Sequence, residues 1–417
     1  MKKKKVRTVA ILTLDENLSE MEELAYSAGM NVVFEIIQRR RRPHPTSFVG
    51  KGKLQDIKET LDIRNIDILL INGVLKPSQH YLLENELKVE CMDRIRLVLE
   101  IFDARASSRE ARLQVQRARL MYEIPLLREW VHKSKSGEHP GFLGGGAYEV
   151  DSYYELIRRQ LARIESDLEK IENNRDLRRK RRTRVGFSTI ALSGYTNAGK
   201  SSLLNLITSE KVLVEDKVFS TLSTTTSRIE GCNKQLLITD TIGFISNLPH
   251  FMIESFKSTL DEIFFADLVL LLIDSSDDEK TFTEKLITSL NILFPDIDIT
   301  NIIIVLTKID KVDDLINKKT IIQSYIPNAT IIGVSSYTRE GIDDLLEIII
   351  DYFAYPIEMS FFLPHSSMAE SLLSWLYDNT DIIVNRTPEG TKVNLHCRES
   401  DHSNIVRYIT EAGGYPN

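Results

Sequence analysis

The stretch Gly194-Tyr-Thr-Asn-Ala-Gly199-Lys200-Ser201 fits the phosphate-binding pattern G-x-x-x-x-G-K-[ST] at every fixed position. Residues 187–193 before it predict a short buried strand, and residues 202–208 after it predict the start of a helix. The two glycines let the backbone wrap closely, so that N–H groups and the helix N-terminus face phosphate oxygens. We expect a nucleoside triphosphate here, with Lys200 on its outer phosphates and Ser201 on Mg²⁺. The expected contacts are Gly194, Tyr195, Thr196, Asn197, Ala198, Gly199, Lys200, Ser201 and Ser202.

A second motif, Asp240-Thr-Ile-Gly243, follows the apolar residues 236–238. A carboxylate at a strand end can hold Mg²⁺ through water, while the glycine N–H approaches the γ-phosphate. The hydroxyl-rich segment Phe219-Ser-Thr221-Leu-Ser-Thr-Thr225 lies between the two motifs and is a natural switch. Its Thr221 is the expected Mg²⁺ ligand and Thr225 the second candidate, with an ordinary Ser/Thr-rich loop as the alternative. Nucleotide contacts are expected from Phe219, Thr221, Asp240, Thr241, Ile242 and Gly243, metal contacts from Ser201, Thr221 and Asp240, and catalytic roles for Lys200 and Thr221.

The base of the nucleotide is indicated by Thr307-Lys308-Ile-Asp310, which ends the apolar run 302–306. Open α/β sheets bind ligands at the carboxyl ends of their strands. The Asp310 carboxylate can accept from the ring N–H and the exocyclic amine of guanine, a donor pair that adenine lacks. The Lys308 stem can lie along the base, and the backbone of Ser335 and Ser336 can contact the guanine oxygen. The motifs in this order predict a GTP-binding domain with GTP or GDP and Mg²⁺ as cofactors.

Size and composition bound the class of protein. At 417 residues, 42% hydrophobic and 27% charged, the chain has the composition of a soluble protein with about three domains. No apolar run is long enough to span a membrane, and the basic N-terminus is not typical of a secretory signal. Cys91, Cys232 and Cys397 lie far apart, without metal-ligand spacing. We expect a cytoplasmic protein with reduced thiols and no membrane partner.

Alternating strand and helix patterns predict a multidomain α/β fold. Four regions are expected: an N-terminal α/β domain (1–105), a long helical hairpin with a basic end (106–185), a P-loop GTPase domain with a mostly parallel sheet (186–355) and a small C-terminal α/β domain (356–417). In the last region, strands are expected at 358–363, 381–384 and 392–396, and helices at 368–377 and 403–412.

The hairpin is predicted from a heptad seam of apolar residues between Val150 and Ile171. Residues 107–133 have similar spacing, and the short connection favours an intramolecular antiparallel partner over a second chain. Pro125 is expected to kink or interrupt the first helix. The glycine-rich residues 134–147 are expected to form a flexible tip, with a projecting probe for a partner as the alternative.

The net charge is −7, but basic residues cluster in two runs. One is Arg39-Arg-Arg-Arg42, and the other contains Arg175, Arg178, Arg179, Lys180, Arg181, Arg182 and Arg184. Such runs are either solvated faces or contacts for a phosphate-rich partner. The turn Phe48-Val-Gly-Lys51-Gly-Lys53 lacks the full phosphate-loop pattern, so a plain helix start is favoured over a second nucleotide site.

These motifs make the chain similar to the HflX group of ribosome-associated GTPases. The resemblance is carried by GYTNAGKS, FSTLSTT, DTIGF and TKID, by Thr46-Ser-Phe-Val-Gly-Lys-Gly-Lys53, and by Arg105-Ala106, Glu110 and Leu113-Gln114-Val115. It implies binding to the large ribosomal subunit and, for some members, splitting of ribosomes. The tip Gly141-Phe-Leu-Gly-Gly-Gly-Ala-Tyr-Glu149 departs from the family's pattern, because it lacks an arginine and a proline. This departure weakens the expectation of tip contacts with ribosomal RNA and of splitting.

Phe244 follows Gly243, at the position where many GTPases have a water-orienting glutamine. We therefore expect slow intrinsic hydrolysis that a ribosome stimulates. The leading hypothesis is a regulatory GTPase, monomeric when free, whose nucleotide state controls docking on the large ribosomal subunit and its rRNA. The alternative is a GTP-controlled protein-interaction switch that uses the hairpin without an RNA partner. A metabolic nucleotide-dependent enzyme ranks last, because no site for an acceptor substrate is evident.

Overall fold

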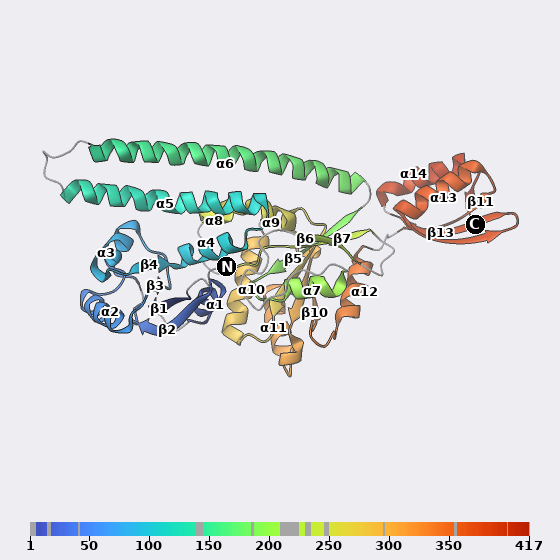
Figure 1. Cartoon of the computed structure of the whole chain (residues 1–417). Coiled ribbons are helices and arrows are strands. Elements are labelled where there is room, and N and C mark those ends of the chain that lie inside the picture. The colour runs from blue at the N-terminus through green and yellow to red at the C-terminus, as the bar shows by residue number, and fades with distance from the viewer. Residues whose placement is uncertain are drawn as a thin grey trace.

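The computed structural model describes residues 6–14, 18–40, 42–137, 145–184, 187–208, 225–229, 235–245, 250–294, 297–353, 357–397 and 399–416. Three β-sheets and a long helical hairpin follow one another along the chain (Figure 1). The expected multidomain α/β fold is confirmed. The boundaries proposed between the domains stay a prediction.

The N-terminal sheet is parallel throughout, with strand order β2-β1-β3-β4. Its strands are β1 (Arg7–Thr13), β2 (Met30–Ile37), β3 (Ile68–Ile71) and β4 (Glu90–Asp93), and its helices are α1 (Ser19–Ser27), α2 (Lys51–Arg64), α3 (Pro77–Leu87) and α4 (Arg94–Arg105). Strand β3 is buried over its whole length, as expected for a parallel strand covered by helices on both faces. The Gly/Lys-rich turn leads directly into α2, with Gly50 as its N-cap residue.

The helical hairpin consists of α5 (Arg109–Gly137) and α6 (Gly145–Arg184), which contact each other along their length. The pairs Arg109–Asp167 (3.0 Å) and Arg117–Glu165 (3.4 Å) show that the two helices are antiparallel partners within one chain. Ile157 and Ile164 are buried in the seam, as the heptad pattern predicted. Both helices are long but highly charged, and none of the described helices is apolar enough to cross a membrane.

Helix α5 continues through Pro125, so the expectation of an interruption is wrong, and the alternative, a kink at this proline, stays a prediction. A proline removes one backbone hydrogen bond and crowds the preceding turn. Contacts of α5 with α3, α4 and α6 stabilise the helix in spite of that loss.

The GTPase-domain sheet has the order β10-β9-β8-β5-β7-β6. Five strands are parallel: β5 (Ser188–Gly194), β7 (Leu236–Asp240), β8 (Leu268–Asp274), β9 (Ile302–Thr307) and β10 (Thr330–Gly333). The edge strand β6 (Thr225–Arg228) is antiparallel to β7. The helices are α7 (Lys200–Ile207), α8 (His250–Ser255), α9 (Lys257–Phe264), α10 (Glu279–Leu293), α11 (Ile316–Tyr325) and α12 (Ile342–Tyr352), with short 3₁₀ turns at Ile299–Asn301 and Ile309–Lys311. The central strands β8 and β9 are fully buried, so their carboxyl ends form a rigid edge for the candidate site.

The C-terminal region forms an antiparallel sheet of order β12-β13-β11-β14. Its strands are β11 (Ile357–Pro364), β12 (Asp381–Thr387), β13 (Gly390–Cys397) and β14 (Tyr415–Pro416), and its helices are α13 (Ser367–Asn379) and α14 (Glu399–Glu411). Both helices contribute to one core with β11 and β13. The strands and helices expected here are present, and β14 is an additional edge strand.

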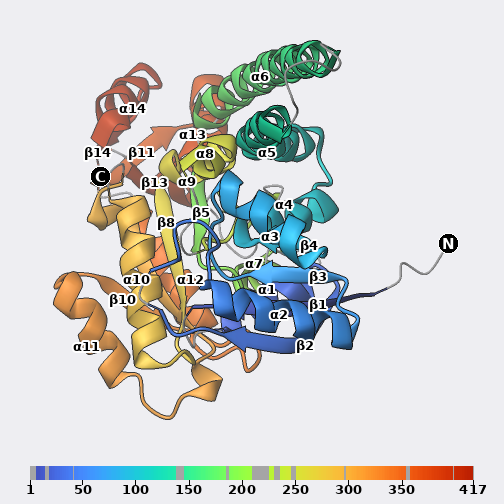
Figure 2. The ribbon, with the colours of Figure 1, turned by 90° about the vertical axis from the view of Figure 1, so that its left-hand side faces the viewer.

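One hydrophobic core joins the N-terminal region, the hairpin and the GTPase domain. Ile242, Ile245, Met252 and Phe256 pack in the same cluster as buried side chains of α1, α4 and α5. The rings of Phe102 and Phe256 meet edge to face at 4.8 Å. Figure 2 shows α8 and α9 next to α4 and α5. Ile245, Met252 and Phe256, which follow Asp240-Thr-Ile-Gly243 in the chain, are therefore part of the core beneath the hairpin.

Candidate nucleotide site

The phosphate-loop motif connects the end of β5 to the start of α7. Gly194 has φ = +137°, and a Cβ atom there would lie 2.2 Å from the backbone oxygen of Leu272, so only glycine fits. Helix α7 begins at Lys200, whose side chain is buried. The Lys200 ammonium donates to the carbonyl oxygens of Gly194 (3.2 Å) and Tyr195 (2.8 Å), which are part of the same loop. A phosphate would have to draw the ammonium away from these carbonyls.

Ser201 and Asp240 lie side by side at the start of α7 and the end of β7. The Ser201 hydroxyl donates to Asp240 Oδ2 at 2.7 Å, and Asp240 is fully buried. The neighbouring Thr241 hydroxyl donates to the carbonyl oxygen of Leu192 at 2.6 Å, which ties this segment to β5. A hydroxyl and a carboxylate thus converge next to the phosphate loop.

Gly243 and Phe244 lie directly against the phosphate loop. The Phe244 N–H donates to Gly194 O and the Thr196 N–H donates to Phe244 O, both at 2.9 Å, forming an isolated parallel bridge. A Cβ at Gly243 would lie 2.8 Å from both Thr196 Cα and Lys200 Nζ. The Phe244 side chain is buried in the core with Tyr195 and Ile263. A phenyl ring has no hydrogen-bond donor or acceptor, so Phe244 cannot orient an attacking water.

Residues from two other segments, Ser335 and Asp274, hold the motif expected to bind the base. The Ser335 hydroxyl donates to Asp310 Oδ1 at 2.6 Å, so this serine orients the carboxylate expected to recognise guanine. Lys308 lies in the left-handed region (φ = +57°), and its ammonium pairs with Asp274 Oδ2 at 2.5 Å. Thr307 is buried and donates through its hydroxyl to Ile273 O at 3.2 Å. Ser336 follows Ser335 at the rim of the same edge.

Two expected contact residues, Phe219 and Thr221, lie outside the described residues, as does most of their segment. The second candidate, Thr225, is the first residue of β6 and is paired with Asp240 across the sheet. The choice between Thr221 and Thr225 as Mg²⁺ ligand stays a prediction.

The sequence interpretation missed Asp274, which ends β8 and reaches Lys308. Its signal is the same as that of Asp240, a carboxylate that ends an apolar strand at the carboxyl edge of the sheet. The spacing of the motifs alone gave no reason to connect it with Lys308, which follows a different strand.

The affinity of the site for nucleotide should depend on pH through Lys200. Burial lowers the pKa of its ammonium to about 8, although the charge of Asp240 acts in the opposite direction. Phosphate favours the charged form, so binding above that pH requires uptake of a proton. We expect the affinity for a fluorescent GDP analogue to be constant near pH 7 and to fall by up to about tenfold per pH unit above pH 8.

Fluorescence titrations across this range test the expectation, with Lys200→Ala as the control. This variant should bind weakly and show no such pH dependence. A wild-type affinity that stays constant well above pH 8 would contradict the role of Lys200.

Known proteins match the chain over most of its length. Residues 15–103, 105–182 and 189–308 match family models described as GTP-binding GTPase N-terminal, GTP-binding GTPase Middle Region and 50S ribosome-binding GTPase. GTPase HflX of Methanocaldococcus jannaschii is 39% identical over 94% of this chain and 95% of its own, and that of Escherichia coli is 34% identical over 81% and 79%. A crystal structure of SsGBP with GDP is 27% identical, covers 83% of this chain and 97% of its own, and has a TM-score of 0.50.

The phosphate loop, the strand-end aspartate and the parallel sheet define this protein as a P-loop GTPase, an enzyme that binds and hydrolyses GTP. The sequence identity with GTPase HflX of Methanocaldococcus jannaschii extends over nearly the whole chain and defines the family within this class. The chain belongs to the HflX family of GTPases.

Proposed function

We propose that this GTPase docks on the large ribosomal subunit and that its nucleotide state controls the docking. The observation that carries the proposal is the match of residues 189–308 to the domain described as 50S ribosome-binding GTPase. The shared core adds a physical route. Ile242 and Ile245 lie within two residues of Gly243 and pack in one core with side chains of α1, α4 and α5. A movement of Gly243 toward a γ-phosphate would therefore also shift this core.

The site residues have the following roles in this proposal. Residues 194–202 hold the phosphates, Thr307, Lys308 and Asp310 hold guanine with Ser335 and Ser336, and Gly243 approaches the γ-phosphate. The oxygens of Ser201 and Asp240, 2.7 Å apart, are the hard ligands that Mg²⁺ prefers, so the residues present fit this ion. Bound Mg²⁺ would neutralise phosphate charge. Thr221, the first candidate of the switch segment, would be a further ligand of this ion.

The structure divides the basic run of α6 into two groups. Arg175 pairs with Glu110 (2.8 Å) and with Glu262 (3.4 Å), and Arg179 stacks on Phe265 with its Cζ 3.8 Å from the ring centre. These two arginines fasten the end of the hairpin to the GTPase domain. In this proposal they do not contact rRNA, because their guanidinium groups already interact with Glu110, Glu262 and Phe265.

Arg178, Lys180 and Arg181 of the same run are exposed on α6, while Arg182 is half-buried. Contacts of these side chains with rRNA phosphates would make binding fall steeply with salt. We call these three residues the exposed basic cluster.

Reversal of the exposed basic cluster (Arg178→Glu, Lys180→Glu, Arg181→Glu) should release the protein from large subunits. We expect binding with a GTP analogue to fall by about tenfold or more at moderate salt, because each lost phosphate contact removes its counterion release. Co-sedimentation with purified large subunits measures this, in GTP analogue and in GDP.

The matched control reverses three exposed basic residues of the C-terminal region, Arg386, Lys392 and Arg407. It changes the net charge equally and should leave binding intact. Equal binding to large subunits in GTP analogue and in GDP would contradict the proposal. Binding that survives both the reversal and high salt favours the alternative, a protein-interaction switch without RNA.

Ribosome stimulation of GTP hydrolysis and splitting of ribosomes are finer parts of the same proposal. Phe244 supports a slow intrinsic rate, since its phenyl ring has no polar atom that could orient an attacking water. Residues 141–144 of the altered hairpin tip lie outside the described residues and residues 145–149 begin α6, so the tip provides no structural support for splitting. Hydrolysis rates and ribosome profiles with and without the protein test both points.

A further inference from the structure

The structure assigns Asp274 as the residue that positions Lys308 against the guanine base. Asp274 ends β8 and lies on a different strand from the Thr307–Asp310 motif, which ends β9. The inference rests on the proposed assignment of that motif to the base. Asp274 acts through Lys308 and is therefore a positioning residue for nucleotide recognition.

Both carboxylate oxygens of Asp274 are held by hydrogen bonds. Oδ2 accepts from the Lys308 ammonium at 2.5 Å, and Oδ1 accepts from the N–H (2.9 Å) and the hydroxyl (2.6 Å) of Ser276. Burial acts against the charged form, but the hydrogen bonds from Lys308 and Ser276 outweigh it and lower the pKa of Asp274. The carboxylate is thus ionised and fixed in direction.

The same turn also fixes the backbone that precedes Lys308. Ser275 donates to the carbonyl oxygen of Thr307 twice, through its N–H (3.0 Å) and its hydroxyl (2.6 Å). Residues 274–276 therefore hold Thr307 by its backbone and Lys308 by its ammonium. With both ends fixed, the aliphatic stem of Lys308 has little freedom, which reduces the entropy that is lost when it packs on a base.

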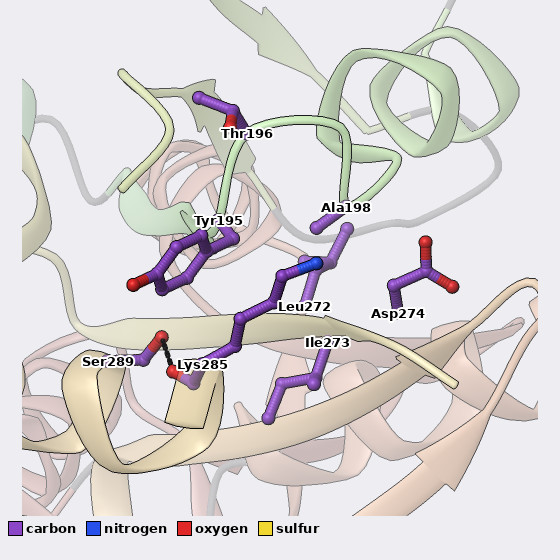
Figure 3. Close-up of a pocket in the computed structure, with 8 residues that line it drawn as sticks. All are labelled: Tyr195, Thr196, Ala198, Leu272, Ile273, Asp274, Lys285 and Ser289. Atoms are coloured by element: carbon purple, nitrogen blue, oxygen red, sulfur yellow. Dashed lines mark hydrogen bonds between the residues drawn. The ribbon is translucent and has the colours of Figure 1, made fainter. Parts of the chain in front are cut away.

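Asp274 also borders a small pocket next to the phosphate loop. The pocket is lined by Tyr195, Thr196 and Ala198 of the loop, Leu272, Ile273 and Asp274 of β8, and Lys285 and Ser289 of α10 (Figure 3). Lys285, which lines this pocket, has its own partner, Asp277, at 2.7 Å. Asp274 therefore pairs with Lys308 and not with Lys285. The Lys285–Asp277 ion pair lies nearby and provides a matched control for the Lys308–Asp274 pair.

The test measures GDP and IDP affinities of the full-length protein. Asp274→Ala should weaken both about tenfold, because the Lys308 stem packs on the ring face that guanine and hypoxanthine share. The preference for GDP over IDP should stay unchanged, since it depends on Asp310. Asp274→Asn keeps the size of the side chain and should give a smaller loss.

The coupling to Lys308 is tested with Lys308→Met, which keeps the stem and removes the ammonium. Asp274→Ala combined with Lys308→Met should bind GDP within about twofold of Lys308→Met alone. Losses that multiply in the double variant would overturn the inference, as would a loss in Asp277→Ala equal to that in Asp274→Ala.

If Asp310→Ala leaves the GDP-over-IDP preference intact, the base-site assignment itself has failed. If Asp310→Ala abolishes that preference while Asp274→Ala binds normally, only the role of Asp274 is wrong.

Discussion

Asp310→Asn should change the base preference of this GTPase from guanine to xanthine. An asparagine amide still accepts from the ring N–H, but it offers an N–H₂ donor where guanine also has a donor. We expect the affinity for GTP to fall at least about a hundredfold, because two donors would face each other in the complex and neither would be paired. Xanthosine triphosphate carries a carbonyl at that position and should bind the variant well.

Competition binding with GTP, xanthosine triphosphate and ATP measures the switch. The Ser335 hydroxyl, which donates to Asp310 Oδ1 at 2.6 Å, can still donate to the amide oxygen and hold it in place. Wild-type protein serves as the control and should reject xanthosine triphosphate. A variant that loses GTP without gaining xanthosine triphosphate would show that Asp310 supports the fold instead of reading the base.

Gly243→Ala should separate GTP hydrolysis from GDP binding. A Cβ atom at this position would lie 2.8 Å from Thr196 Cα, and a backbone atom cannot move aside as a flexible side chain can. The segment 243–244 must therefore withdraw from the phosphate loop, which breaks the bridge between Phe244 and residues 194–196. We expect hydrolysis to fall by about a hundredfold or more, since the γ-phosphate loses its neighbouring N–H.

GDP affinity should stay within a few-fold of wild type in this variant, because GDP has no γ-phosphate. Single-turnover hydrolysis and equilibrium GDP binding provide the two measurements. Gly52→Ala is a suitable control, since a Cβ there meets no atom within 4 Å. Equal loss of GDP binding and hydrolysis would contradict a role specific to the γ-phosphate.

Much of the fold could be predicted from short-range patterns. The phosphate loop, the heptad seam of α6 and the apolar strands β8 and β9 depend on local spacing, which the chain displays directly. The predicted interruption at Pro125 does not occur, because contacts with α3, α4 and α6 stabilise α5, and no local pattern shows these contacts.

The basic run of α6 also shows that a local sequence pattern does not reveal which side chains are packed in the fold. Seven nearby positive charges suggest one surface in the sequence. Heptad geometry turns Arg175 and Arg179 inward to Glu110, Glu262 and Phe265, while Arg178, Lys180 and Arg181 point outward. Only the fold places Glu262, 87 positions further along the chain than Arg175, within reach of these arginines.

The sequence by itself determined which chemistry this protein has. A phosphate loop, a strand-end aspartate and the motif expected to recognise guanine need fixed residue types at short spacings. They can therefore be recognised without a structure. The tertiary structure alone decided how those parts are held and connected. Asp274 reaches Lys308 from a neighbouring strand, Ser335 orients Asp310, and Ile242 and Ile245 join the site to the core beneath the hairpin. Such contacts depend on strand order and helix packing, which bring together residues that no local pattern links.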